Sequence, residues 1–480
     1  MKPNILFILI DSFRSDKCFG STKTSITPNL DSLIKNGTYF TQAISSAPTT
    51  IPTISSIFTA LYPSSSLSLD DTLFKLNPKI TTMIEILIEN GYTAFATIPD
   101  ALKHAGLEKI FGANIDEFDY QSNLYNDIGQ LILKRLDKIT LKEPWFYYIH
   151  LYDIHGTATF NKGSIPDQYY DTKYGVNQYE RMVSLVDYWI GKILNKIDPN
   201  KTIVILTADH GSDVGNYDLR MENIHKKVVS LREFKKTPIF QTSHSIATKL
   251  PRSFLSIRKR LAKFYLDRKN NDITKKKDLF WKDVVNDFQT PYEKRILDNC
   301  ITGMGHIYDD NLRVPLVFTG PNLHTNKIDQ QIRTIDIFPT IIDILGFKIN
   351  RENIHGQSLL DIIQGKEFEE TPAIIESATN VLNSLNRNLI GVRTSEYKYF
   401  RDKNDKNKNI HLYNLKSDPT EENNIAFINN DVVIKMEKIL FDIITDITLD
   451  TNKEQLSTEE KLSKEEKERA LETLKKLGYI

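Results

Sequence analysis

Short apolar runs alternate along the chain with segments whose apolar residues recur at helical spacing. Five of the runs predict buried strands, namely Asn4–Ile10, Ala94–Ile98, Trp145–Leu151, Thr202–Thr207 and Pro315–Thr319. Five amphipathic segments predict the helices between them, namely Asn29–Asn36, Thr53–Leu61, Ile80–Asn90, Leu124–Ile139 and Tyr179–Lys196. Strands that alternate with helices in this way are typical of a mostly parallel sheet with helices on both faces, so the pattern predicts an α/β fold.

The C-terminal part of the chain has a different pattern. Ile390–Phe400 and Ile410–Leu415 predict strands of a small antiparallel sheet. Further on, Ser463 and Glu466 form a capping-box sequence, and Gly478 stands where a helix commonly ends. We therefore expect a small C-terminal sheet followed by a terminal helix that packs on the main body.

The length of 480 residues is too great for one ordinary domain. We expect a catalytic domain over residues 1–365 and a C-terminal subdomain over residues 366–480. Within the first, residues 218–300 carry 20 Lys and Arg against 10 Asp and Glu. This basic insertion is either a solvated helical insertion, or a lid or docking surface for a polyanionic substrate or anionic lipid.

Composition limits the surroundings and partners of the protein. The formal net charge is +0, which does not indicate nucleic-acid binding. The apolar run Asn4–Ile10 is too short for a signal peptide, and no run approaches the roughly 18 residues of a membrane span. Two cysteines, Cys18 and Cys300, cannot form a disulfide framework and are interpreted as inert thiols. We expect a cytoplasmic protein without a transmembrane segment.

Acidic residues stand at or near the ends of three predicted strands. Asp11 ends the first strand, Asp153 lies two residues beyond the third, and Asp209 with His210 follows the fourth. Ligands of parallel sheets bind beyond the carboxyl ends of the strands, so Asp11, Asp209 and His210 are candidates for one cation site. On these residues alone, a surface Asp-His-Gly turn and a salt bridge between Asp11 and Arg14 remain alternatives.

The loop Ala47–Thr53 leads into a predicted helix, with Pro52 in a position that suits a first helical turn. Thr50 would then lie just outside the helix N-terminus, where free backbone N–H groups and the helix dipole favour an anion. A hydroxyl that touches a bound cation there can lose its proton and attack phosphorus or sulfur. The alternative is that Thr49 or Thr50 is only an N-cap.

Taken together, these segments resemble the sulfatase family of the alkaline-phosphatase superfamily, and the resemblance runs through the whole chain. Twelve segments carry it in the expected order, namely Pro3–Arg14, Thr27–Leu33, Asn36–Phe40, Thr50–Pro63, His150–His155, Thr207–Gly211, Tyr308–Leu316, Asp336–Gly346, Gly356–Leu360, Gly391–Lys398, Leu412–Glu421 and Leu477–Ile480. The resemblance implies an alkaline-phosphatase-like fold and metal-dependent ester chemistry.

The resemblance also implies a role for each residue that matches a family motif. The implied metal ligands are Asp11, Thr50, Asp209 and His210. The implied catalytic residues are Thr50 as nucleophile, with His155 and His306. The implied substrate contacts are Arg14, His155 and His306. Alternative registers would place Thr49 or Ser46 at the nucleophile position.

Several positions depart from the family pattern. Sulfatases proper carry Cys or Ser as the nucleophile, oxidised to formylglycine, with an arginine four residues later; this chain has Thr50 and Ile54 there. Many sulfatases place two aspartates at the first metal turn, whereas Asp11 is followed here by Ser12. With one carboxylate fewer and a histidine in the set, we expect one divalent cation, with Zn²⁺ or Mn²⁺ better suited than Ca²⁺ or Mg²⁺.

The histidines differ in how well they fit the family spacing. His306 follows the basic insertion and lies slightly off the common spacing. Within the insertion, His225 and His244 are lesser candidates for the same role. His150 lies in an apolar run, so we interpret it as a core histidine. The others are interpreted as structural, namely His104, His355 and His411.

Threonine as nucleophile is typical of the phosphoryl-transfer members of the superfamily. We therefore predict a metal-dependent ester hydrolase that cleaves or transfers a phosphoester or phosphodiester through a covalent intermediate on Thr50. One alternative is a sulfuric ester hydrolase without formylglycine, and an alternative of another class is a non-catalytic relative that binds an anion. The expected partner is a small anionic ester, without nucleic acid, and peripheral membrane contact through residues 218–300 is a further option.

Overall fold

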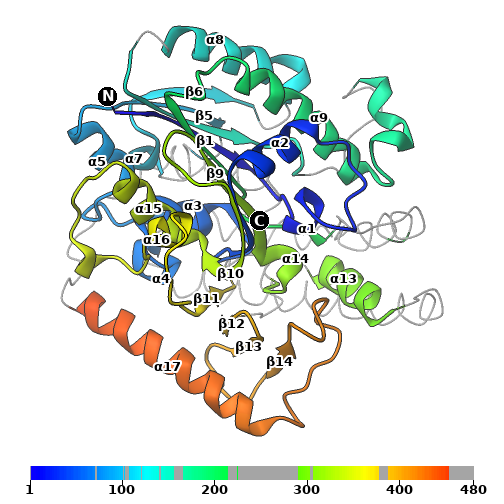
Figure 1. Ribbon diagram of the computed structural model, residues 1–480. Helices are drawn as coiled ribbons and strands as arrows, with labels where there is room; N and C mark the ends of the chain where they lie inside the picture. Colours follow the sequence, from blue (N-terminus) through cyan, green and yellow to red (C-terminus); the bar gives the residue numbers. More distant parts are fainter. Residues whose placement is uncertain are drawn as a thin grey trace, which may run out of the picture.

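The computed structural model of the protein describes residues 2–70, 73–100, 102, 107–119, 122–139, 142–155, 166–213, 224, 290–302, 306–377 and 388–452. An eight-stranded sheet forms the centre of the larger part of the molecule (Figure 1). In sheet order its strands are β10 (Asn326–Arg333), β2 (Thr38–Ile44), β9 (Arg313–Thr319), β8 (Thr202–Thr207), β1 (Asn4–Ile10), β7 (Trp145–Leu151), β5 (Thr93–Pro99) and β6 (Asn114–Phe118). β9 runs antiparallel to both of its neighbours and the other pairs are parallel, which confirms the predicted mostly parallel sheet.

The central strands are buried on both faces. Every residue of β1, β7 and β8 is buried. Parallel strands with helices on both sides read as continuous apolar runs rather than alternating ones, because neither face meets water. This is why the bounds of these three strands could be predicted from the sequence alone.

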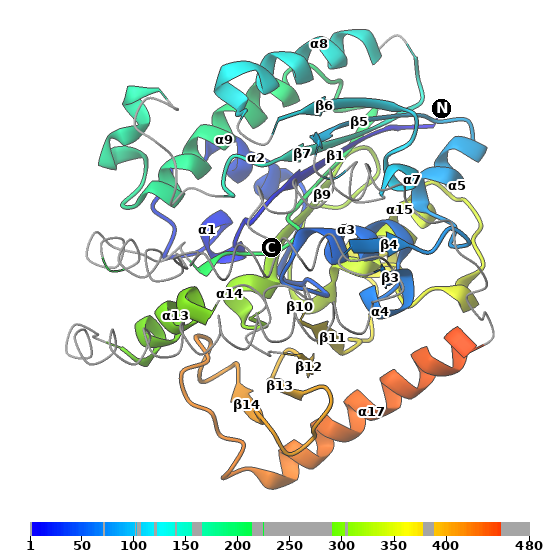
Figure 2. The same cartoon turned by 180° about the vertical axis from the view of Figure 1, so that it is seen from behind.

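Helices cover both faces of the sheet (Figures 1 and 2). One face carries α2 (Pro28–Asn36), α8 (Gly129–Ile139) and α9 (Gln178–Leu194), which contact one another through α9. The other carries α3 (Thr50–Thr59), α5 (Met83–Glu89) and α15 (Ile337–Ile344), which contact one another through α3. The remaining described helices are α1 (Ser15–Cys18), α4 (Pro63–Ser66), α7 (Glu108–Phe111), α13 (Pro291–Thr302), α14 (Asp309–Leu312), α16 (Leu360–Ile363) and α17 (Asn430–Asn452).

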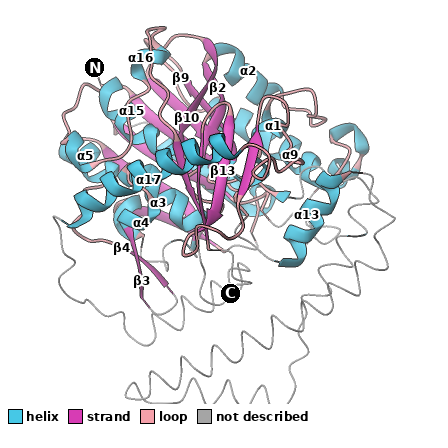
Figure 3. Cartoon of the chain, turned by 90° about the horizontal axis from the view of Figure 1, so that it is seen from below, coloured by secondary structure: helices cyan, strands magenta, loops and turns pink. Residues whose placement is uncertain are grey.

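A small antiparallel sheet lies beside the main body. Its order is β11 (Ala373–Glu376), β12 (Leu389–Arg393), β13 (Tyr397–Asp402) and β14 (His411–Asn414). The long helix α17 packs on β12 and β13 (Figure 3). Met436 and Leu440 of α17 are buried against Ile390, Val392 and Tyr399 of the sheet. The strands β3 (Leu67–Asp70) and β4 (Leu73–Leu76) form a separate two-stranded sheet.

The small sheet differs in two ways from its prediction. The predicted strand Ile390–Phe400 is two strands, because the Thr394 hydroxyl accepts from the backbone N–H groups of Glu396 and Tyr397 and closes a turn between them. Helix α17 was not predicted, and the predicted terminal helix from Ser463 to Gly478 lies outside the described residues. The domain boundary at residue 365 stays a prediction.

Candidate metal centre and active site

Two of the predicted acidic residues meet because their strands are neighbours in register. β1 and β8 pair in parallel, and Leu9 lies opposite Thr207. Asp11 and Asp209 therefore leave the sheet side by side, each two residues beyond this pair. Both carboxylates are fully buried. A buried carboxylate is costly unless it is paired or bound to a cation, so the carboxyl end of these two strands needs positive charge.

Histidines supply part of that charge. The Nδ1 atom of His155 lies 2.7 Å from Oδ1 of Asp11, and Nε2 of His150 lies 3.2 Å from Oδ2 of Asp11. The Nε2 atom of His210 lies 3.5 Å from Oδ2 of Asp209. His150 and His155 both come from the end of β7, which is the other neighbour of β1 in the sheet.

Thr50 lies in the same cluster. Its hydroxyl donates to Oδ2 of Asp11 at 3.2 Å and lies 3.4 Å from Nε2 of His210. The structure corrects the predicted start of this helix from Thr53 to Thr50, so Thr50 is the first residue of α3 and Thr49 has the N-cap position. The N-cap alternative fails for the described residues, since the Thr49 side chain makes no cap hydrogen bond. The N-terminus of α3, whose dipole favours an anion, thus lies at Thr50.

The cluster fits a divalent cation. One group of ligand atoms that lie within 4.8 Å of one another comes from Asp11, His155 and His210, and a second comes from Asp11, His150 and Asp209. Among the described residues, Oδ2 of Asp209 accepts no hydrogen bond although it is buried. A mixed set of carboxylate oxygens and imidazole nitrogens suits a transition-metal ion such as Zn²⁺.

The protonation of the cluster reflects its burial and its crowding. Burial alone would raise the pKa of Asp11, but the charge of His155 and the hydrogen bond from His150 outweigh burial and hold this pKa well below its usual range. Burial raises the pKa of Asp209, and the negative charge of Asp11 raises it further. Burial would lower the pKa of His155, but Asp11 raises it above its usual value. Two buried carboxylates this close compete for the same positive charge.

Gly211 is required by close packing at the second metal turn. A Cβ atom at this position would lie 1.9 Å from the backbone oxygen of Asp310. The Gly211 N–H donates to the carbonyl of Asn311 at 2.9 Å, which ties the turn to the segment before β9. The near approach of the Asp310 backbone therefore requires glycine at this position.

The structure places Arg14 beside the cluster but engages its guanidinium elsewhere. Arg14 Nη1 lies 2.7 Å from Oδ1 of Asp310, Nε lies 2.8 Å from Oδ1 of Asp16, and Nη1 donates to the carbonyl of Ser212. The partner of Arg14 is thus not Asp11, which was the alternative considered from the sequence. Its proposed contact with a substrate anion stays a prediction.

His306 is buried just before α14. It is not part of either group of candidate ligands in the part of the chain that the structure describes. Its role at the substrate stays a prediction. The lesser candidates His225 and His244, and nearly all of the basic insertion 218–300, lie outside the described residues.

Sequence reasoning assigned two residues of the cluster no active part. His150 is buried as expected for a core histidine, yet its Nε2 faces Asp11 while its Nδ1 lies 2.9 Å from the hydroxyl of Tyr148. Ser12 was noted only as a missing carboxylate, yet its hydroxyl donates to Asp11. The signal for His150 was its position near the end of a strand, next in sequence to residues that form the turn.

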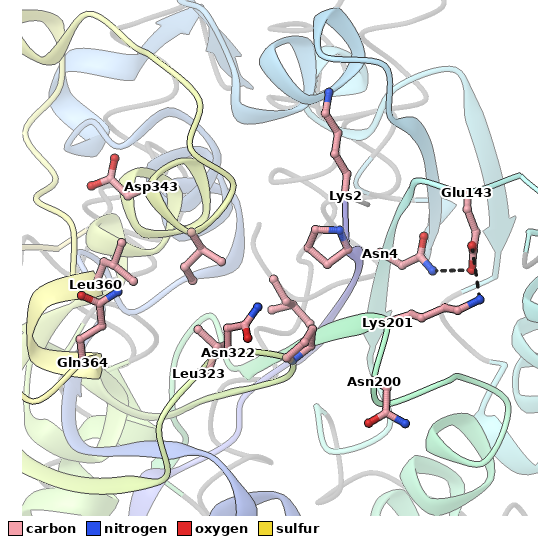
Figure 4. A pocket seen from close by; sticks show the side chains of 14 residues that line it. Lys2, Asn4, Glu143, Asn200, Lys201, Asn322, Leu323, Asp343, Leu360 and Gln364 are labelled. Carbon is pink, nitrogen blue, oxygen red and sulfur yellow. Dashed lines mark hydrogen bonds and ion pairs between the residues drawn. The ribbon is translucent and has the colours of Figure 1, made fainter.

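A pocket of about 420 Å³ lies at the opposite end of the strands, where β1 and β8 begin (Figure 4). Its lining includes Lys2 and Asn4 at the start of β1 and Lys201 at the start of β8 (Figure 4). Seven residues of strand separate these from the cluster, which is about 20 Å at about 3.3 Å per residue. The pocket is therefore distinct from the candidate metal centre.

Comparisons with known proteins agree with the fold. Residues 3–279 match the family described as "Sulfatase", and residues 303–446 match "N-sulphoglucosamine sulphohydrolase, C-terminal". The first match covers more than half of the chain, so the chain belongs to the sulfatase family. This confirms the resemblance found in the sequence.

Individual relatives are distant. Arylsulfatase K of Gallus gallus is 19% identical over 475 residues, which cover 92% of this chain and 82% of that protein. N-acetylglucosamine-6-sulfatase of Homo sapiens is 33% identical over 79 residues, which cover 16% of this chain and 12% of that protein. A solved 2-O GAG sulfatase is similar with a TM-score of 0.63 at 16% identity, covering 96% of this chain and 95% of the other.

The family defines the class of protein. The chain is a sulfatase-like hydrolase that acts on ester bonds, as predicted. Sulfatases are metal-dependent, and the described residues include a cluster that could hold a metal ion. Among the helices that the structure describes, none is long and apolar enough to cross a membrane. The roles of single residues, the identity of the metal and the kind of ester remain predictions.

Proposed function

We propose that the chain is a hydrolase of phosphoesters or phosphodiesters in which Thr50 is the nucleophile. The observation that carries the proposal is the position of the Thr50 hydroxyl. It lies at the first residue of α3 and within hydrogen-bonding reach of Asp11 and His210, the proposed metal ligands. Asp209 completes the proposed ligand set, and its buried Oδ2 supports a cation at this place because, in the described part of the chain, it has no hydrogen bond.

Thr50 has the surroundings of an activated hydroxyl. Its hydroxyl donates a hydrogen bond to Oδ2 of Asp11, which orients the oxygen for attack. A divalent cation held by Asp11, Asp209 and His210, for which Zn²⁺ or Mn²⁺ is proposed, would lower the pKa of this hydroxyl and polarise the ester. The dipole of α3 would favour the negative charge on the other oxygens of the substrate, although Pro52 has no N–H and the Thr53 N–H already donates to the Thr49 carbonyl.

The proposed reaction has two displacements. The oxygen of Thr50 forms a bond to phosphorus as the bond to the leaving oxygen breaks, and the leaving oxygen takes a proton. His155 is the better candidate to give it, because Asp11 raises the pKa of His155 and so favours its protonated form. Water then attacks the phosphothreonine and releases Thr50, unless an alcohol accepts the phosphoryl group instead.

Threonine favours phosphorus over sulfur. In sulfatases proper, the hydrated aldehyde carries a second hydroxyl on the same carbon, which can expel the bound sulfate. A threonine has no such hydroxyl, so its ester must be opened by attack of water at the central atom. Sulfate ester hydrolysis is the second candidate, because the relatives are named arylsulfatase K and N-acetylglucosamine-6-sulfatase.

The test compares 4-nitrophenyl esters of one leaving group, namely a phosphomonoester, a phosphodiester, a phosphonate and a sulfate. We expect turnover of a phosphorus ester to exceed that of the sulfate, and Thr50→Ala to lower kcat by at least about 10³-fold. Thr49→Ala is the matched control, since among the described residues its buried hydroxyl has no hydrogen-bond partner. That variant should keep its activity.

Three other outcomes would favour another ester, another nucleophile or a protein without catalytic activity. Greater turnover of the sulfate would support the second candidate. Activity that survives in Thr50→Ala but not in Thr49→Ala would move the nucleophile by one residue. Absence of both bound metal and turnover of any ester would leave the non-catalytic, anion-binding relative.

A further inference from the structure

Ser12 touches both buried carboxylates of the candidate centre. Its backbone N–H donates to Oδ1 of Asp209 at 3.1 Å, and its hydroxyl donates to Oδ1 of Asp11 at 2.7 Å. The same hydroxyl lies 3.2 Å from Nδ1 of His155. The main chain of Ser12 therefore joins the turn after β1 to the turn after β8, while its side chain holds the carboxylate of Asp11 in its own turn and contacts His155.

The backbone of Ser12 is held in an uncommon conformation. Its φ is +60°, in the left-handed region that few residues other than glycine adopt. The Tyr179 hydroxyl donates to the Ser12 carbonyl at 2.7 Å and accepts from the Arg14 N–H at 3.0 Å, which fixes the turn from the side of α9. Ser12 thus keeps a strained backbone conformation that hydrogen bonds hold in place at a candidate site, which indicates that the strain serves the site.

The consequence of this arrangement is a fixed pair of carboxylates. The hydrogen bonds from Ser12 occupy Oδ1 of Asp209 and Oδ1 of Asp11. The His210 N–H also donates to Oδ1 of Asp209, at 2.7 Å, so both donors together leave Oδ2, which accepts no hydrogen bond among the described residues, on the side of the His210 imidazole. The oxygen that remains is the one that a cation would take. Hydrogen bonds that orient ligands in this way commonly change metal affinity about 10–100-fold.

We propose that Ser12 is a positioning residue that sets both the affinity and the metal preference of the centre, by aligning Asp11 and Asp209 while adding no third carboxylate. The proposal rests on the metal-dependent part of the proposed function and not on the choice of phosphate or sulfate. A neutral hydroxyl at this place keeps the negative charge of the centre low, which disfavours Ca²⁺, since this ion takes many oxygen ligands, several of them from carboxylates.

The test measures metal binding without substrate, by equilibrium dialysis of the metal-free full chain against Zn²⁺, Mn²⁺, Ca²⁺ and Mg²⁺. Ser12→Ala removes the hydroxyl and should weaken Zn²⁺ and Mn²⁺ binding about 10–100-fold. Ser12→Gly removes it as well but adopts the positive φ without strain, so an equal loss would exclude backbone strain as the cause. Ser12→Asp should raise the affinity for Ca²⁺ relative to Zn²⁺ by at least about tenfold.

A purely structural role of Ser12 would change stability but not the ratio of metal affinities. The melting temperatures of the metal-free variants show whether each one is folded, and Ser12→Gly serves if Ser12→Ala is not. Wild-type Zn²⁺ affinity in the glycine variant, or an unchanged order of metals in Ser12→Asp, would overturn the proposal. Because no ester is present, neither result depends on whether Thr50 is the nucleophile.

Discussion

The protein buries two clusters of carboxylates that are satisfied in opposite ways. One is the candidate metal centre, where among the described residues the ion pairs of Asp11 and Asp209 are all with histidines. The other lies at the junction with the small sheet, where Asp309 accepts Arg393 at 2.8 Å and Lys398 at 2.9 Å. Arginine and lysine are permanent cations at neutral pH, whereas histidine is not.

This difference appears in the acidity of the carboxyl groups. Burial would raise the pKa of Asp309, but Arg393 and Lys398 hold it far below its usual range. In the centre, the pKa of Asp209 is raised by burial and by Asp11. In the junction cluster of Asp309, Glu421, Arg393 and Lys398, two permanent cations balance the two carboxylates, although burial raises the pKa of Glu421. In the centre, Asp209 has only a histidine as its ionic partner, which favours a cation as ligand.

The largest effect should follow from removing Asp209. Asp209→Ala should lower kcat/KM by at least about 10³-fold, because a proposed metal ligand is lost. The metal-free variant should be at least as stable as the metal-free wild type, since like-charge repulsion with Asp11 is relieved. Urea unfolding in the presence of a chelator measures this. If metal-free Asp209→Ala were clearly less stable than the metal-free wild type, Asp209 would have a structural role. The contrast between the candidate metal centre and the junction cluster would then fail.

The matched change in the junction cluster should do the reverse. Asp309→Ala leaves Arg393 and Lys398 buried without this partner, which costs about 3–5 kcal/mol of unfolding free energy. Activity per folded molecule should stay within a few-fold of wild type. Chemical denaturation and active-site titration measure the two quantities separately. Equal losses of stability in Asp309→Ala and Asp209→Ala would break the comparison.

Two buried carboxyl groups, Asp310 beside the junction cluster and Asp209 in the candidate metal centre, should respond to acid with opposite sign. Asp310, which pairs with Arg14 and Arg295, has its pKa lowered to about 2 although burial opposes this. A lowered pKa gives stability that is present above the unfolded value of about 4 and is lost as pH falls toward 2, here roughly 2 kcal/mol. Asp209, with its raised pKa, loses its contribution in the metal-free protein as pH rises.

Urea unfolding of the metal-free protein from about pH 5 to about pH 2.5 covers the acidic window. Asp310→Asn should flatten the loss of stability on acidification. Asp209→Asn should not change the loss of unfolding free energy on acidification. Its unfolding free energy should increase relative to that of the wild type as pH rises. A slope that Asp310→Asn does not change would mean that other carboxylates carry the acid sensitivity.

The sequence predicted the sheet better than the site because the two depend on different information. β1, β7 and β8 are apolar without interruption since helices cover both faces, and this pattern is local. Strand ends also placed Asp11 and Asp209 correctly. The pairing of Arg14 with Asp310 joins residues far apart in the chain, so no local pattern predicts it.

Two further features depended on contacts between elements. Ser12 was interpreted by what it lacks, and only the register of β1 with β8 shows that it bridges two turns. Helix α17 packs a buried stripe on the small sheet while Ile434 and Phe441 stay exposed, so its sequence does not show a clean amphipathic pattern.

A smaller effect on metal affinity is expected from Tyr148, whose hydroxyl contacts His150 on the side away from Asp11. Tyr148→Phe removes the hydroxyl that lies 2.9 Å from Nδ1 of His150 and should let the imidazole change its tautomer or orientation. Metal affinity should fall about tenfold or less, as for other partners that orient a ligand. Isothermal titration with Zn²⁺ measures this. An unchanged affinity would mean that His150 contributes to the core rather than to the centre.

The central claim is that the charge deficit around Asp11 is filled by one divalent cation. Metal analysis of the dialysed full chain by plasma mass spectrometry tests it most directly. The account predicts about one Zn²⁺ or Mn²⁺ per chain in the wild type and in Asp309→Asn, and almost none in Asp11→Ala. A wild-type protein that holds no divalent cation after reconstitution, or an Asp11→Ala variant that holds as much as the wild type, would contradict it.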